Sequence, residues 1–218
     1  MSRNLKILGL ALMAIIAMSA VVVSLASAAE VEFKLESSPT VLTGTQEGSG
    51  DVFHTMGGNV TCGKATYEGS VTGTSSPEAE VEPTYGNCTA FGFINVPIHI
   101  NECRYRFTSG EEKGGNFEGS LDSVCPEGKA IEITSPGCRV TVGTQTPTGG
   151  TITYTNIGTG AAREIRLDVA LTGIHYIEDE NGGGCSSAGV TTTDGTYNGH
   201  VTVTGENAKK VHRGIWVE

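Results

Sequence analysis

The stretch Arg163-Glu-Ile-Arg-Leu-Asp-Val-Ala-Leu171 decides the fold, because apolar and charged side chains alternate along most of it. In an extended chain, the aliphatic residues at odd positions from Ile165 to Leu171 share one face and the charged residues share the other. This alternation predicts a strand with one buried and one solvated face. Beyond Gly173 the large residues move to even positions, so we expect a bulge or bend at that glycine.

Short alternating segments of this kind recur along the chain, whereas helical periodicity is missing after residue 28. The chain holds 31 glycines, many of them between these segments, as in the turns of an all-β protein. Further strands are predicted at residues 31–36, 51–55, 94–100, 103–108, 117–124, 130–134, 138–142, 151–156 and 211–217. The stretches 43–50, 109–116 and 178–184 are predicted to be loops from their composition.

These elements predict an all-β fold, an antiparallel β-sandwich stapled by disulfides. A β-barrel or two packed β halves would give the same strand pattern, so both remain alternatives.

Two nine-residue segments of the chain are similar to each other. Residues 66–74 (Thr-Tyr-Glu-Gly-Ser-Val-Thr-Gly-Thr) match residues 196–204 (Thr-Tyr-Asn-Gly-His-Val-Thr-Val-Thr) at the Thr, Tyr, Gly and Val positions in one register. In each segment the tyrosine and the valine would share a face, and the glycine between them leaves room for a neighbouring ring or a bend. A duplicated half-domain and chance similarity of two strands both account for the match.

The N-terminus has the three parts of a secretory signal peptide. Basic residues precede an apolar run from Ile7 to about Val23, and a small-residue Ala-Ser-Ala28 site follows. We therefore predict cleavage after residue 28, so that residues 1–28 are the signal peptide and residues 29–218 form a single extracellular domain. The predicted location is the medium or the cell envelope. An uncleaved membrane anchor is the alternative, since the apolar run is long.

All six cysteines follow the predicted signal peptide, and an even number in an exported chain favours three disulfides. Their spacing contains neither a close pair for zinc nor a Cys-x-x-Cys redox motif. Of the possible connectivities, the one that joins nearest neighbours is Cys62–Cys88, Cys103–Cys125 and Cys138–Cys185.

The charge of the chain excludes some partners. After removal of residues 1–28, 12 basic and 24 acidic residues remain, a net charge of −12. Nucleic acids and anionic membrane surfaces bind basic footprints, so we expect neither as a partner once the signal peptide is cleaved. An extracellular protein, a glycan or a component of the cell envelope remains as the expected kind of partner.

Recognised catalytic motifs are absent from the sequence. Neither the Gly-x-Ser-x-Gly turn of serine hydrolases nor His-Glu-x-x-His of zinc peptidases occurs. We therefore predict that the protein is not an enzyme. The alternative is a secreted glycan hydrolase, which needs two carboxylates about 5–9 Å apart. It would draw them from Glu111, Glu112, Glu178, Asp179 and Glu180.

One acidic segment is a candidate metal site. Glu178-Asp-Glu-Asn181 precedes three glycines, and carboxylate and amide oxygens on a flexible chain are the ligands that calcium prefers. The residues offered to calcium are Glu178, Asp179, Glu180 and Asn181. A solvated acidic loop without a metal is the alternative, and no other cofactor is expected.

The order of several short motifs resembles that of a family of uncharacterised secreted bacterial proteins, β-rich and with six cysteines. The motifs are Val60-Thr-Cys62 with Ala65-Thr-Tyr67, Tyr85-Gly-Asn-Cys88 with Phe91-Gly-Phe-Ile94, Cys-Arg pairs at Cys103 and Cys138, and Gly214-Ile-Trp-Val-Glu218. The resemblance covers most of the chain and implies export and a cysteine-stapled β domain. The family has no known activity, so the resemblance implies no site residues.

Together these features predict an exported, non-catalytic protein with a binding or structural role, outside the cell or in its envelope. A calcium-dependent surface adhesion or matrix subunit is a further alternative beside the hydrolase.

Overall fold

The computed structural model describes residues 30–38, 40–48, 50–180, 184–185 and 188–218, so the predicted signal peptide lies outside the described residues. The described chain is β throughout except for one 3-10 turn, η1 (Gly160–Ala162), and all pairings between its strands are antiparallel. An all-β, antiparallel, disulfide-stapled fold is therefore confirmed. The part of the chain that the structure describes holds no helix that could span a bilayer.

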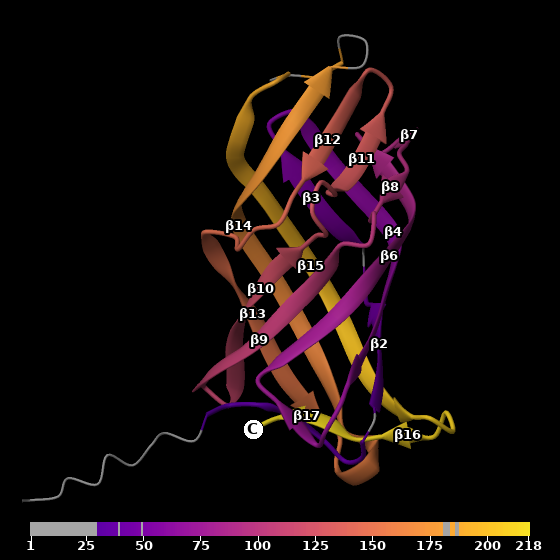
Figure 1. Ribbon diagram of the computed structural model, residues 1–218, viewed down its shortest axis with the longest axis vertical. Helices are drawn as coiled ribbons and strands as arrows, with labels where there is room; N and C mark the ends of the chain where they lie inside the picture. Colours follow the sequence, from indigo (N-terminus) through magenta and orange to yellow (C-terminus); the bar gives the residue numbers. More distant parts are fainter. Residues whose placement is uncertain (1–29, 39, 49, 181–183, 186–187) are drawn as a thin grey trace, which may run out of the picture.

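Most of the strands pair edge to edge, and eight of them close into a ring (Figure 1). The ring closes because β15 pairs with β14 on one side and with β2 on the other. In ring order the strands are β2 (Thr40–Gln46), β4 (Gly58–Val71), β6 (Glu78–Ala90), β9 (Arg104–Lys113), β10 (Asn116–Val124), β13 (Gly149–Ile157), β14 (Glu164–Glu180) and β15 (Thr191–Asn207).

Strand alternation determines which side chains fill the ring. Ile165, Leu167, Val169 and Leu171 of β14 are buried in the main core, as their alternation predicts. The predicted bulge is also confirmed: Gly173 has a φ of +69°, and the pairing of β14 with β15 shifts between Leu171 and Ile174. Because the ladder is interrupted there, the backbone of β14 near residue 175 is left for other partners.

Two short strands share one position in the ring. β2 pairs with the lower parts of β4 and β15 in Figure 1, and β3 (Asp51–Thr55) pairs with their upper parts. Gly48 and Gly50, with φ values of +75° and +107°, lie at the break between β2 and β3. The first residue after this break is Asp51.

A small sheet closes the lower end of the ring (Figure 1). It consists of β17 (Ile215–Val217), β1 (Phe33–Leu35) and β5 (Ser75–Ser76). The inward side chains of β1 and β17 are at most 3% exposed, namely Phe33, Leu35, Ile215 and Val217, and Phe33 packs edge-on against Tyr154 at 5.4 Å. Beyond the strand ends, Glu32 and Glu218 exchange both of their backbone hydrogen bonds.

Shorter strands extend the upper end of the ring. β12 (Cys138–Val142) pairs with the end of β14, followed outward by β11 (Ile131–Ser135) and β8 (Ile98–His99). β7 (Ile94–Asn95) pairs with β6, and at the lower end β16 (His212–Arg213) pairs with β15.

The predicted loops at 43–50, 109–116 and 178–184 are wrong where strands cover them. Residues 43–46 belong to β2, and residue 49 lies outside the described residues. Residues 109–113 belong to β9 and residues 178–180 to β14, and residues 181–183 lie outside the described residues. Backbone pairing with β10 and β12 holds these hydrophilic residues in strands, because an outward face of a strand tolerates charge.

The three disulfides join Cys62 to Cys88, Cys103 to Cys125 and Cys138 to Cys185, so the nearest-neighbour pairing is confirmed. Cys62 and Cys88 lie opposite each other on β4 and β6, beside Asp51 of β3. Three disulfides indicate that the chain folds in an oxidising environment, which is consistent with an extracellular protein.

Candidate functional site

A cavity of about 80 Å³ lies inside the upper half of the ring. Its walls are mainly aliphatic and aromatic and come from the ring and from the strands of the upper end. The polar side chains on its lining include one carboxylate and three tyrosines: Asp51, Tyr85, Tyr105 and Tyr197. A concave, mostly apolar site with a few convergent polar groups is typical of small-molecule binding.

Asp51 is the charged residue at the centre of this site. It is the first residue of β3 and only 2% exposed, and its side chain turns inward on the same face as Phe53. Its Oδ2 accepts a hydrogen bond from the Tyr67 hydroxyl at 2.6 Å. Its Oδ1 is buried and has no hydrogen-bond partner among the described residues. Most buried polar atoms in proteins have a partner, so this oxygen requires an explanation.

Four tyrosines from four strands surround the carboxylate. The hydroxyls of Tyr67 (β4) and Tyr197 (β15) lie 3.0 Å apart, and those of Tyr85 (β6) and Tyr105 (β9) lie 3.0 Å apart. The ring of Tyr67 contacts those of Tyr85 and Tyr105, with centroids 6.2 and 6.5 Å away. We refer to these five residues as the Asp51–tyrosine cluster.

Burial determines the protonation of the cluster. It raises the pKa of each tyrosine well above its usual value, so all four hydroxyls stay protonated near neutral pH. Burial also raises the pKa of Asp51, against the lowering effect of the hydrogen bond from Tyr67, of the nearby Tyr197 hydroxyl and of the His200 charge. The cluster is therefore a set of neutral hydroxyls around one carboxyl group that is difficult to ionise.

The hydroxyl protons can be followed one by one, because a tyrosine has a single proton to donate. Tyr67 donates to Asp51, so Tyr197 must be the donor in the bond between the two tyrosine hydroxyls. This leaves the Tyr197 oxygen and the Asp51 Oδ1 as free acceptors. Of Tyr85 and Tyr105, one donates to the other, which leaves a single hydroxyl proton free. With Asp51 ionised, the cluster thus offers more acceptors than donors.

The two similar segments of the sequence meet in this cluster. Tyr67 and Tyr197 occupy equivalent positions in them, and both turn toward the interior as the alternation predicts. The glycine of the second segment, Gly199, makes room for the carboxylate: a Cβ at this position would lie 2.5 Å from Asp51 Oδ1. In the first segment, Gly69 instead makes room for the backbone of β6.

One wall of the cavity is a strap, residues 143–148, which crosses from β12 to β13. Gln145 exchanges backbone hydrogen bonds with Ser123 of β10. Its side-chain amide accepts from the His175 N–H at 2.7 Å and donates to the His175 carbonyl at 2.8 Å. Gln145 thereby takes the place of a strand partner beside the bulge of β14, and it lines the cavity together with Pro147.

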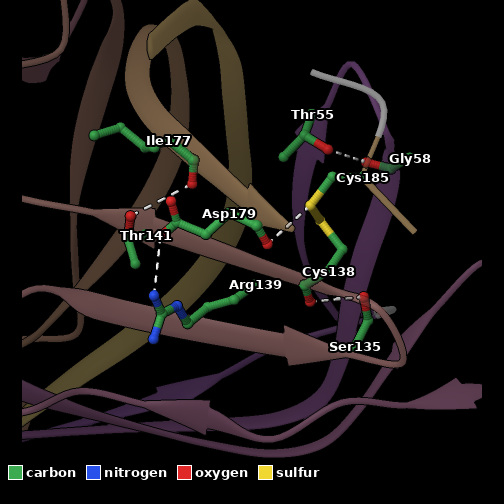
Figure 2. The surroundings of a disulfide bond; sticks show 9 residues. All are labelled: Thr55, Gly58, Ser135, Cys138, Arg139, Thr141, Ile177, Asp179 and Cys185. Carbon is green, nitrogen blue, oxygen red and sulfur yellow. Dashed lines mark hydrogen bonds and ion pairs between the residues drawn. A yellow bond between two sulfur atoms is a disulfide. The ribbon is translucent and has the colours of Figure 1, made fainter. Parts of the chain in front are cut away.

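The acids predicted to bind calcium lie mostly on a strand. Glu178, Asp179 and Glu180 belong to β14, where the side chains of Glu178 and Asp179 lie on opposite faces, and Asn181 lies outside the described residues. Asp179 forms an ion pair with Arg139 of β12 at 3.1 Å, as Figure 2 shows. The carboxylate of Glu178 is buried and lies within 4.8 Å of both sulfurs of the Cys138–Cys185 disulfide. Calcium binding at these residues stays a prediction.

The acids considered for glycan hydrolysis fall into two separate groups. Glu111 and Glu112 lie near the lower end of β9. The strand pairings across β10 and β13 place Glu112 at the same height in the sheet as Leu167 of β14. Glu178 is eleven residues farther along β14, about 35 Å at the usual rise per strand residue. Hydrolysis needs carboxylates about 5–9 Å apart, so these two groups cannot form one pair.

Asp51 was not among the site residues predicted from the sequence. A signal was present in the predicted strand 51–55, where alternation puts Asp51 on the same face as the aromatic Phe53. An acid at a core-facing position of a strand is rare unless it has a role.

Comparison of the chain with protein-family models, with curated proteins and with solved structures finds no match, so the chemistry of the cavity carries the functional assignment.

Proposed function

We propose that this chain is an exported binding protein that holds a small, largely apolar molecule inside the strand ring, and that it acts by binding rather than by catalysis. The observation that carries the proposal is the buried Asp51 Oδ1, which lacks a hydrogen-bond partner among the described residues and belongs to a residue that lines the cavity. A ligand that provides the missing partner would remove the cost of leaving it unpaired.

The remaining walls suit the apolar part of such a molecule. Aliphatic side chains of the ring and of the upper strands, among them Leu121 of β10, Ile133 of β11 and Ile174 of β14, line the cavity. The fixed ring and the Cys62–Cys88 disulfide next to Asp51 hold the site in shape before the ligand arrives, which lowers the entropic cost of binding.

Two observations favour binding over catalysis. The tyrosines of the cluster remain protonated near neutral pH, because burial raises the pKa of each hydroxyl, so they are poor bases. The cluster also contains one carboxylate, whereas the hydrolase alternative needs two that face each other.

A matched pair of substitutions on β14 tests the proposal. Ile174 lines the cavity and is 7% exposed, whereas Ile177 on the same strand is 39% exposed. Ile174→Phe should fill the cavity and Ile177→Phe should leave it open. Binding of 1-butanol, 1-butylamine and butyrate would be measured by titration of the amide NMR signals of each protein.

We expect at least one of the three molecules to bind the wild type and Ile177→Phe with a Kd on the order of 1 mM, the range for ligands of this size. Ile174→Phe should bind the same molecule at least tenfold more weakly. The proposal fails if none of the molecules binds, or if Ile174→Phe binds as well as the wild type.

A further inference from the structure

The Asp51–tyrosine cluster also indicates which chemical class the ligand belongs to. We infer that the ligand is an organic amine whose ammonium group binds Asp51 Oδ1 and the Tyr197 hydroxyl oxygen, with its apolar part against the aliphatic walls; this inference rests on the proposed function.

The free hydrogen-bond acceptors of the cluster are placed where an ammonium group could bind. Asp51 Oδ1 is buried and without a partner among the described residues, and the proton sequence from Tyr197 through Tyr67 to Asp51 leaves the Tyr197 oxygen free to accept. Both residues line the cavity, and Asp51 Oδ1 and the Tyr197 hydroxyl both lie near Gly199, 2.5 and 3.1 Å from the position that a Cβ would take there. An ammonium group donates hydrogen bonds and accepts none, which complements these two oxygens.

The negative charge of ionised Asp51 also favours a cationic ligand. An ionised carboxylate in an apolar cavity is stabilised by an opposite charge, and a cation beside it would counteract the burial that raises the pKa of Asp51. An anionic ligand would add a second buried negative charge. A neutral ligand would leave the carboxylate uncompensated.

The tyrosine rings around Asp51 likewise favour an ammonium group. Tyr67, Tyr85 and Tyr105 form a group of rings with centroids 6.2 and 6.5 Å apart, and Tyr85, Tyr105 and Tyr197 line the cavity. Cations within about 6 Å of an aromatic ring are attracted by its electron-rich face, and cages of aromatic rings recognise ammonium groups in this way.

The size of the cavity limits the apolar part of the amine. The cavity of about 80 Å³ is smaller than the roughly 150 Å³ of a protein cavity that binds benzene. A short alkyl chain fits this space, which makes 1-butylamine a suitable probe.

Three molecules with the same alkyl chain distinguish the classes: 1-butylamine is a cation at pH 7, 1-butanol is neutral and butyrate is an anion. Their dissociation constants would be measured with the oxidised protein by titration of the Gly199 and Asp51 amide NMR signals. We expect 1-butylamine to bind at least tenfold more tightly than 1-butanol, and butyrate not to bind.

Two variants with the same change of charge identify the residue responsible. Asp51→Asn should reduce the preference for 1-butylamine over 1-butanol to about one. Glu112→Gln, at an exposed position of β9, should keep the tenfold preference. Tyr197→Phe retains the ring and removes the oxygen, so it should weaken 1-butylamine several-fold; this variant provides a second test if Asp51→Asn does not fold.

Each remaining outcome overturns one of the two proposals. If 1-butanol binds in the cavity as tightly as 1-butylamine, or if Asp51→Asn retains the preference, the amine inference is wrong and the proposed binding function stands. If none of the three molecules binds the wild type, the binding function fails as well.

Discussion

At the scale of the residue, the burial of Asp51 couples the stability of the fold to pH. Its pKa is raised above the ordinary value of 3.8, mainly by burial, so the folded state holds the proton more tightly than the unfolded state does. Between these two pKa values the stability of the ligand-free protein falls as pH rises, and above the folded pKa the penalty is complete. The titratable groups around Asp51 are Tyr67, Tyr85, Tyr105 and Tyr197, and the charge of His200 acts on Asp51 from the outer face of β15.

Asp51→Asn should therefore stabilise the ligand-free protein at pH 7. The asparagine oxygen can still accept from Tyr67, and the gain should be about 1–3 kcal/mol, the usual cost of a buried polar atom without a partner. Denaturant unfolding at pH 7 and below pH 3.8 would measure it, since the gain should shrink as Asp51 becomes protonated in both states. Glu112→Gln, at an exposed position of β9, serves as the control. A loss of stability at pH 7 would contradict this account.

The space beside Asp51 depends on Gly199. A Cβ there would lie 2.5 Å from Oδ1 and 3.1 Å from the Tyr197 hydroxyl, and the Tyr67 hydrogen bond prevents the carboxylate from moving away freely. Gly199→Ala should cost about 1–3 kcal/mol, as overpacking of a core does. The matched control is Gly86→Ala on β6, where a Cβ would meet only Lys64 Cβ, at 3.9 Å. Thermal unfolding of both variants would check this, and equal midpoints would argue against it.

The residues of the site differ in how far the sequence could predict them. The two tyrosines of the similar segments could be placed on inward faces, because alternation fixes the face of each strand residue. That their hydroxyls meet at 3.0 Å depends on β2 and β3 lying between their strands. No local pattern encodes that arrangement. Asp51 was missed although its alternation with Phe53 was visible.

At the scale of the element, the strap is the wall of the cavity that depends most on one side chain. Gln145→Ala removes both hydrogen bonds to the His175 backbone and leaves the contact with Ser123 in place. We expect the His175 amide to exchange with solvent at least tenfold faster, since a free energy of about 1.4 kcal/mol corresponds to a factor of ten. Hydrogen exchange followed by NMR measures this rate.

Thr146→Val is the matched control for the strap. It removes only the hydrogen bond to Asp122, on the β10 side, and should leave exchange at His175 close to the wild-type rate. Equal exchange rates in both variants would mean that Gln145 does not hold the strap against β14.

Elements with a regular aliphatic alternation were predictable, and others were not. The strand at 163–171 and the bulge at Gly173 follow directly from the spacing of large side chains. β2 was missed, because its inward positions include Thr40 and Gly44, which do not read as apolar. The closing of the ring could not be predicted either, because β2 and β15 lie far apart in the sequence and alternation does not specify which strand a given strand pairs with.

At the scale of the whole molecule, the disulfides supply much of the stability. They close loops of 26, 22 and 47 residues, each of which should contribute about 3–4 kcal/mol by restricting the unfolded chain. Replacing the pair Cys138 and Cys185 by alanine should cost the most, because this loop is the longest. Denaturant unfolding of the three paired variants would check the order, and an unchanged midpoint after replacement of any pair would contradict it.

Because β1 pairs with β17, the order of the strands along the chain can be changed without changing which strands are neighbours. Glu32 and Glu218 are hydrogen-bonded neighbours, so a linker of a few residues could join them and the chain could be reopened in the exposed Gly114-Gly115 turn between β9 and β10. Such a circular permutant would retain all the strand pairs, with both new ends on one hairpin. The permuted chain would begin at β10 and end at β9, and the same strands would still enclose the cavity.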